Sequence, residues 1–166
     1  MTSFDKAFDY TMEWEGGSKL TNDPDDPGGL TKYGISKRSH PDVDIENLTE
    51  EGAKTLYALG YWGGINGNLL AEKSERLAIK VFDAGVNIGT VRAVKFLQEC
   101  INGMDEIGIK IVEDGRLGAG TLAAIDLVDI DTLLELYVIR LEKYYTALNK
   151  PKYLKGWLRR ARALPC

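Results

Sequence analysis

An N-terminal helical pattern that ends in a glutamate and runs directly into a turn-rich segment limits the possible folds of this chain more than any other feature. Phe4, Ala7, Phe8 and Met12 recur at the spacing of one helix face, and Glu15 continues that face. The helix dipole disfavours a negative charge at a helix C-terminus, so a glutamate is a poor choice here on structural grounds alone. The alternative is a solvated side chain that merely ends the helix.

The segment after the glutamate is rich in residues that favour tight turns. Gly16-Gly17 can end the helix, and Asp23-Pro24 and Asp26-Pro27 are strong turn signals. Tyr33 and Ile35 alternate with polar neighbours, as the residues of a short strand do. We therefore predict a small β-hairpin that folds back towards the end of the helix.

Glu15 and Asp26 provide two carboxyl groups that the predicted hairpin can bring to face each other. Hydrolysis of a glycosidic bond needs two carboxyl environments, because one acid must stay protonated near neutral pH while a second group handles water or the developing positive charge. Burial of Glu15 on the apolar helix face would favour its protonated form. Asp26 has an alternative role as a turn cap that bonds its own backbone, and this is the role we favour for Asp23 and Asp25.

Metal chemistry fits the sequence poorly. The acidic turn lacks the D-x-D-x-D-G spacing of a calcium loop, and its two prolines restrict the backbone. His40 is the single histidine and precedes Pro41 in a loop, so histidines and cysteines form no cluster with metal-ligand spacing. Cys100 lies in a predicted helix and Cys166 at the terminus, so we expect two free thiols. We predict no metal and no cofactor.

The rest of the chain is dominated by helical periodicity. Residues that can cap helices occur at Thr49, Ser74 and Thr90. Apolar stripes over 133–141 and 153–161 lie on either side of Pro151, which ends the first of them. The alternating isoleucines of 107–111 predict a short strand before the Asp114-Gly115 turn. The expected fold is mainly α, with several helices and the small hairpin beside the N-terminal helix.

Size and charge indicate one globular domain. At 166 residues the chain can bury about two-thirds of its unfolded surface in a single core. The formal net charge of -4 gives no general affinity for nucleic acid. No apolar run is long enough to span a bilayer, and the N-terminus lacks the basic and apolar regions of a signal peptide.

Several motifs of this chain, in their order and spacing, resemble those of the glycoside hydrolase family 108 muramidases, which are lysozyme-like enzymes found in bacteria and as bacteriophage endolysins. The matching strings are Glu15-Gly16-Gly17, Asp26-Pro27-Gly28-Gly29-Leu30-Thr31, Gly34-Ile35-Ser36, Tyr61-Trp62, Phe82-Asp83-Ala84-Gly85-Val86-Asn87-Ile88-Gly89, Leu97-Gln98, Asp114-Gly115-Arg116-Leu117-Gly118 with Thr121, and Gly156-Trp157-Leu158 with Arg160. The resemblance spans nearly the whole chain. It implies a lysozyme-like multi-helix fold, with a catalytic region at 1–101 and a helical, peptidoglycan-binding-like segment at 102–166, packed together as one compact domain.

The resemblance also implies a muramidase that cleaves the β-1,4 bond between N-acetylmuramic acid and N-acetylglucosamine in peptidoglycan. Glu15 would be the catalytic acid. By similarity to phage-type lysozymes, Asp26 would be the second carboxylate and Thr31 would order the water. Two rival classes are a lysozyme-like module that binds peptidoglycan without cutting it, and a lytic transglycosylase that forms an anhydro sugar.

Further side chains are candidates for holding the glycan strand. Tyr33 and Tyr61 could stack on sugar rings, whereas core packing is the favoured role of Trp62. Asn87 either binds a sugar N-acetyl group or is a polar residue near a helix end. We therefore carry Tyr33, Tyr61 and Asn87 forward as candidate substrate-binding residues.

The lack of a signal segment, together with the resemblance, predicts an endolysin that is made in the bacterial cytoplasm, is released by a holin or by lysis, and acts on the cell wall as a monomer. Basic residues gather near the C-terminus, at Lys150, Lys152, Lys155, Arg159, Arg160 and Arg162. They form either a solvated helix face or a surface attracted to the anionic wall or inner leaflet.

Overall fold

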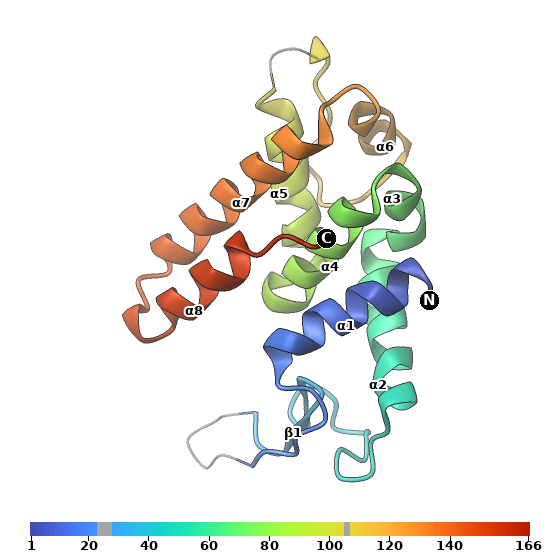
Figure 1. Cartoon of the computed structure of the whole chain (residues 1–166), viewed down its shortest axis with the longest axis vertical. Helices are drawn as coiled ribbons and strands as arrows, with labels where there is room; N and C mark the ends of the chain where they lie inside the picture. Colours follow the sequence, from blue (N-terminus) through green and yellow to red (C-terminus); the bar gives the residue numbers. More distant parts are fainter. Residues whose placement is uncertain (23–27, 105–106) are drawn as a thin grey trace.

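Helices dominate the computed structural model, which describes residues 1–22, 28–104 and 107–166 (Figure 1). The helices are α1 (Ser3–Glu15), α2 (Glu50–Tyr57), α3 (Gly67–Lys73), α4 (Glu75–Ile88), α5 (Thr90–Asn102), α6 (Ala119–Ile125), α7 (Ile130–Ala147) and α8 (Pro151–Arg162). A π-helical turn (Ala58–Trp62) and a 3₁₀ turn (Gly63–Ile65) link α2 to α3. Two short strands, β1 (Thr31–Lys32) and β2 (Ile35–Ser36), form a hairpin. The mainly α fold with a small hairpin is confirmed.

The hairpin is tied to the end of α1. Its antiparallel register pairs Thr31 with Ser36 and Lys32 with Ile35. Tyr33 and Gly34 make the two-residue turn with φ of 53° and 72°, and positive φ at both positions suits the twist of a tight hairpin. Tyr33 therefore lies in the turn, and its place in a strand was predicted wrongly. Its backbone N–H donates to the carbonyl of Gly17 at 2.9 Å, which fixes the hairpin beside the C-terminus of α1.

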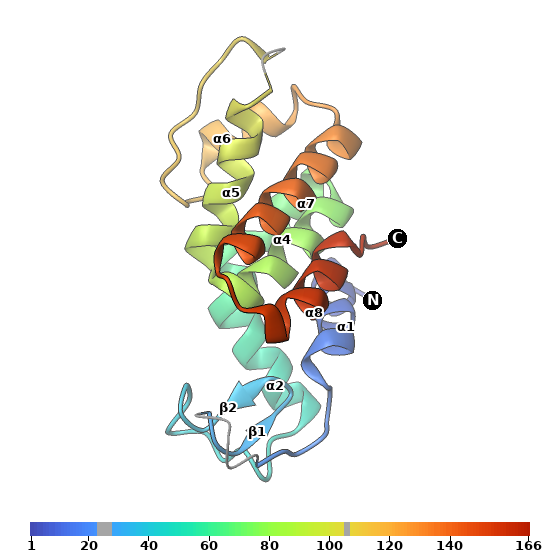
Figure 2. The same ribbon diagram turned by 90° about the vertical axis from the view of Figure 1, so that its left-hand side faces the viewer.

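The central helix of the fold is α4. Residues 77–85 are all buried, and a helix buried around its whole circumference needs neighbours on every side. α1, α3 and α5 pack against it, while α7 and α8 form an antiparallel pair that runs beside α4 and α5 (Figures 1 and 2). Two of the buried α4 residues, Lys80 and Asp83, are charged and therefore need partners inside the protein.

The strand predicted over 107–111 is absent from the described part of that segment. The side chain of Asn102 accepts a hydrogen bond from the N–H of Ile111 and donates one to its carbonyl, both at 2.9 Å. These backbone groups are satisfied locally, so they need no partner strand.

The C-terminal helices pack directly onto the N-terminal ones. α7 lies against α5, and the hydroxyl of Tyr10 in α1 donates to the carbonyl of Ala163 at 2.8 Å. The functional division at residues 101 and 102 stays a prediction. Cys100 is buried, Cys166 is exposed, and both are free thiols. Within the residues that the structure describes, no helix has the length and apolar character to cross a membrane.

Candidate active site

Glu15 is the last residue of α1 and lies where the helix gives way to the hairpin segment. Thr2 and Asp5 form a reciprocal capping box at the start of α1, and Gly16 ends the helix in the left-handed conformation with a φ of 79°. The side chain of Glu15 is 21% exposed, so it is neither a fully solvated helix end nor sealed in the core. A ligand can therefore reach this carboxylate while protein groups hold it.

The group that holds Glu15 comes from the far end of the chain. Nη1 of Arg160, in α8, donates to Oε1 of Glu15 at 2.8 Å. The same guanidinium donates from Nε and Nη2 to Oδ1 of Asp83, in α4, at 3.1 and 2.9 Å. Asp83 and Arg160 are almost wholly removed from water, with side chains 4% and 10% exposed. The surroundings of Glu15 are thus partly ionic, in contrast to the apolar pocket predicted from its helix face.

The charge of Arg160 is secured by its partners. Burial alone would lower the pKa of its guanidinium, but the negative charge and hydrogen bonds of Asp83, together with those of Glu15, outweigh burial and raise the pKa. A permanently charged, planar guanidinium bound to two carboxylates fixes the orientation of both.

A buried lysine fixes the helix that carries Arg160. Lys80, in α4, is 0% exposed, and its Nζ donates to the carbonyls of Arg160 and Ala163 at 2.9 and 2.7 Å. These carbonyls belong to the C-terminal end of α8, where a cation is favourable. Burial lowers the pKa of Lys80 to about 8, against the opposing effect of the nearby Asp83 charge. Lys80 and Asp83, three residues apart on α4, thus hold the backbone and the side chain of Arg160.

The hairpin turn approaches Glu15 from the other side. A Cβ added at Gly34 would lie 2.9 Å from Oε2 of Glu15 and 2.7 Å from the hydroxyl of Tyr57, so the turn lies close to both groups. That hydroxyl donates to the carbonyl of Tyr33 at 2.8 Å. Burial, and next the charge of Glu15, raise the pKa of Tyr57, which keeps the phenol a neutral donor.

Two of the predicted site residues, Tyr61 and Thr31, lie in the π-helical turn and in the hairpin. Tyr61 is half-buried in the π-helical turn, its ring 5.3 Å from that of Tyr57, and burial and the Glu15 charge raise its pKa. Thr31 is in β1, where its hydroxyl donates to the carbonyl of Gly29 at 3.0 Å. Neither residue has a hydrogen bond to Glu15 among the described contacts.

Two other predicted residues have structural partners. Oδ1 of Asn87, one turn beyond Asp83 on α4, accepts a hydrogen bond from the hydroxyl of Tyr145 at 2.6 Å. The Tyr33 ring is buried and lines a cavity of about 320 Å³ together with residues of α1, and Glu15 is not among the lining residues. Trp62 is buried in the core, as favoured from the sequence, and its indole N–H donates to Oδ1 of Asn68.

Asp23, Asp25 and Asp26 lie outside the described residues, so the predicted second carboxylate stays a prediction. In the described ranges, no group of three or more histidine, cysteine or carboxylate side chains is arranged to hold a metal ion.

Sequence reasoning did not select Asp83, Arg160 or Lys80 as site residues. Asp83 and Lys80 interrupt a run of apolar residues in 77–85, and an unexpected charge in a buried helix is the signal that could have found them. Arg160 is one of six basic residues near the C-terminus, and local sequence does not distinguish the one that turns inwards.

Comparison with known proteins assigns this architecture. Residues 8–89 match the family described as Glycosyl hydrolase 108, and residues 92–162 match the "Predicted Peptidoglycan domain". The chain therefore carries a glycosyl hydrolase 108 domain followed by a peptidoglycan-binding domain. Glu15, Asp83 and the hairpin all fall in the first match and Arg160 falls in the second, so the ion pair between Glu15 and Arg160 joins the two matched segments.

The fold of this chain is also seen in a solved structure. The chain is similar to the structure titled "Structure of Brucella abortus SagA", with a TM-score of 0.74, 27% sequence identity, and coverage of 95% of this chain and 88% of that one. No curated protein matches the chain. The lysozyme-like fold is thus confirmed, and the protein is a peptidoglycan hydrolase of the glycoside hydrolase class.

Proposed function

We propose that this protein is a muramidase that hydrolyses the β-1,4 bond between N-acetylmuramic acid and N-acetylglucosamine, with Glu15 as the general acid. The observation that carries the proposal is the junction at Glu15. This partly exposed carboxylate is held by Arg160 on one oxygen and is approached by the hairpin turn on the other. A positioned carboxyl group that substrate can reach is what proton donation to a leaving oxygen requires.

The contacts favour one oxygen of Glu15 as the proton donor. Oε1 accepts the hydrogen bond from Arg160, so the transferable proton would sit on Oε2, on the side of the Gly34 turn. Arg160 shares its charge with Asp83, so it does not neutralise Glu15 alone. Its role is to keep the Glu15 side chain in one rotamer as the sugar binds.

Asp26 and Thr31 complete the proposed mechanism. Thr31 belongs to the same hairpin as Gly34, and its hydroxyl, which donates to Gly29, retains lone pairs that can accept a hydrogen bond from water. Asp26 would stabilise the oxocarbenium-like transition state or activate the water. Tyr61, close to Tyr57, would contact the sugar chain, and Asn87 would bind an N-acetyl group.

The decisive experiment compares Glu15→Gln with a matched control on the same helix, Glu13→Gln, whose side chain is exposed. Glutamine keeps an acceptor for Arg160 but has no proton of suitable acidity to transfer. We expect turnover of purified peptidoglycan to fall by about 10²–10⁴-fold in Glu15→Gln. The control should keep its activity and melt near the parent temperature. Glu15→Gln should stay folded at the assay temperature but lose some stability, because it removes one of the two carboxylates that compensate the buried Arg160.

Mass spectrometry of the released fragments distinguishes the rival mechanisms. Reducing N-acetylmuramic acid ends support hydrolysis of the proposed bond, whereas anhydro sugars would identify a lytic transglycosylase. A protein that sediments with the wall and releases no fragments would be a binding module. Near-normal turnover in Glu15→Gln would refute the role of Glu15.

We also propose that the protein acts on the cell wall after release from the cytoplasm, as an endolysin does. The support is the substrate class, since peptidoglycan lies outside the cytoplasmic membrane. Expression with and without a co-expressed holin, followed by culture turbidity, tests this route: lysis should require the holin.

A further inference from the structure

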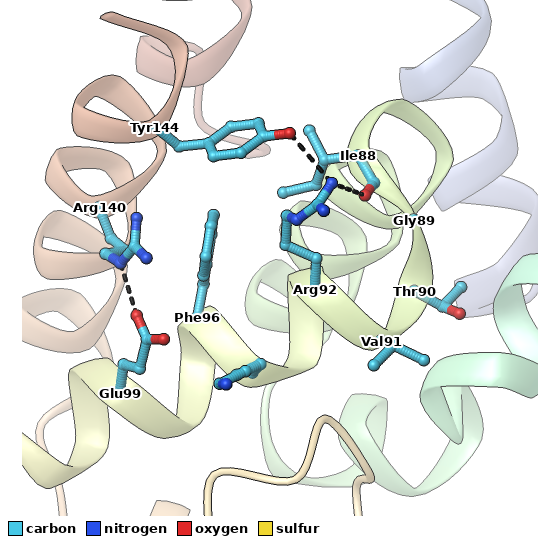
Figure 3. A pocket seen from close by; sticks show the side chains of 10 residues that line it. Ile88, Gly89, Thr90, Val91, Arg92, Phe96, Glu99, Arg140 and Tyr144 are labelled. Carbon is cyan, nitrogen blue, oxygen red and sulfur yellow. Dashed lines mark hydrogen bonds and ion pairs between the residues drawn. The ribbon is translucent and has the colours of Figure 1, made fainter. Parts of the chain in front are cut away.

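A large cavity lies away from Glu15. It is a groove of about 760 Å³ between α5 and α7, beginning at the corner where α4 meets α5 (Figure 3). The side chains that matter to its chemistry are Arg92, Lys95, Phe96, Glu99, Arg140 and Tyr144. All six belong to the segment that matches the peptidoglycan domain.

Arginines cover the aromatic rings of this groove. Cζ of Arg140 lies 3.6 Å from the ring centroid of Phe96, and Cζ of Arg92 lies 5.2 Å from that of Tyr144. Phe96 stands between the two guanidinium groups (Figure 3). Packing against a ring restrains a guanidinium while its N–H groups stay available for a carboxylate. Because cations already occupy these ring faces, the groove suits an anionic group better than a sugar ring.

The positive charge of the groove is only partly compensated. Nε of Arg140 donates to Oε2 of Glu99 at 2.6 Å, which pairs one cation. Nη1 of Arg92 donates to the Ile88 carbonyl and the Tyr144 hydroxyl, and neither group is charged. Lys95 is exposed and has no hydrogen-bond or ion-pair partner in the part of the chain that the structure describes.

The groove and the candidate active site share helix α4. It begins at Ile88, directly after Asn87, whose side chain bonds Tyr145, the neighbour of Tyr144. Asp83, which anchors Arg160 and through it Glu15, precedes Ile88 on α4 by about 7.5 Å along the helix axis. One end of the groove and the carboxylate that anchors Arg160 therefore lie on the same helix.

We propose that the groove between α5 and α7 binds the acidic peptide stem of peptidoglycan, with Arg92 and Lys95 as ligands of its carboxylates. This rests on the proposed function. N-acetylglucosamine is neutral, whereas the peptide stems carry carboxylates, so the uncompensated cations select the peptide part of the polymer. The stem attached to a muramic acid would thus be held while Glu15 acts on the strand.

The test measures binding in full-length Glu15→Gln protein, so that it does not depend on hydrolysis. The two probes are peptidoglycan with intact stems and the same glycan strands stripped of peptide by an amidase, with the lactyl carboxyl that this hydrolysis frees on each muramic acid converted to an uncharged methylamide. We expect the added pair Arg92→Gln and Lys95→Gln to weaken binding to the intact polymer about tenfold. Binding to stripped strands should change less than twofold.

A second pair, Arg116→Gln and Lys143→Gln, is the matched control. Both residues are exposed in the same domain and lie outside the groove, and the pair removes the same net charge. It should leave binding to both probes within twofold. Thermal melting of every variant checks that the fold is retained.

Three results would overturn the groove proposal: equal losses on intact and stripped strands, no loss on either, or an equal loss in the control pair. Failure of the hydrolase assignment would give a different result from failure of the groove proposal. In that case the parent protein would release no fragments from either probe, while the binding comparison would still report on the groove.

Discussion

The Glu15 junction and the groove between α5 and α7 make opposite use of arginine. Arg160 is buried, so its charge must be compensated by protein, and Glu15 and Asp83 both bind it. Arg92 is exposed, packs on an aromatic ring and bonds uncharged groups. Burial decides the difference: a buried guanidinium is fixed and can orient the carboxylates it binds, whereas an exposed one can exchange water for a ligand.

The largest expected effect is a loss of stability when Asp83, a partner of the buried Arg160, is changed. Asp83→Asn leaves a buried guanidinium with one carboxylate in place of two, and breaking a buried ion pair typically costs about 3–5 kcal/mol. We expect a loss of about 3 kcal/mol in the free energy of unfolding, measured with urea. Glu99→Gln is the matched change in the groove, where the paired side chains are 26% and 30% exposed, and should cost under about 1 kcal/mol. Equal costs would remove burial as the distinguishing factor.

The next effect is the pH dependence of stability that Lys80 causes. Its pKa is about 8 in the folded protein and 10.5 in the unfolded chain, so between these values the unfolded state binds more protons. Stability from this group therefore rises with pH from about 8 to 10.5, and is lost as pH falls back through that window. Relative to Lys80→Met, the parent should gain about 3 kcal/mol across it, at about 1.4 kcal/mol per pKa unit.

Urea unfolding of the parent and Lys80→Met at pH 8 and pH 10 measures this difference. Lys73→Met, in an exposed ion pair with Asp126, is the control and should track the parent at both pH values. A constant difference between the parent and Lys80→Met would contradict the prediction.

The smallest effect separates backbone strain from crowding at the hairpin. Gly34 and Gly29 both have positive φ, 72° and 67°, but only Gly34 has close neighbours, Glu15 and Tyr57. Gly34→Ala should therefore cost about 2 kcal/mol and reduce lytic activity, because the new Cβ displaces the Glu15 carboxylate. Gly29→Ala should cost about 1 kcal/mol, from strain alone, and keep more activity. Similar activity losses would mean that the Glu15 carboxylate tolerates the displacement.

Local sequence signals predicted the end of α1 and the hairpin, because Gly16 and the turn residues act through their own backbone preferences. They misplaced Tyr33, since alternation alone does not separate a strand residue from a turn with positive φ. They also predicted a strand at 107–111, where a single asparagine side chain satisfies the backbone.

The ionic network at Glu15 could not be predicted in the same way. It joins α1, α4 and α8, and it depends on which face of α8 turns towards α4, a choice made by tertiary packing. Periodicity reports which residues share a helix face but not which face of another helix they meet. The resemblance named Glu15 as the candidate catalytic acid but carried no information about its partners.

The ion pair between Glu15 and Arg160 also limits when the surroundings of Glu15 can be complete during synthesis of the chain. Synthesis on the ribosome delivers α1 and the hairpin first, long before the guanidinium that clamps them has been made. A nascent chain lacks this clamp until α8 has been made, so the contacts of Glu15 stay incomplete until then.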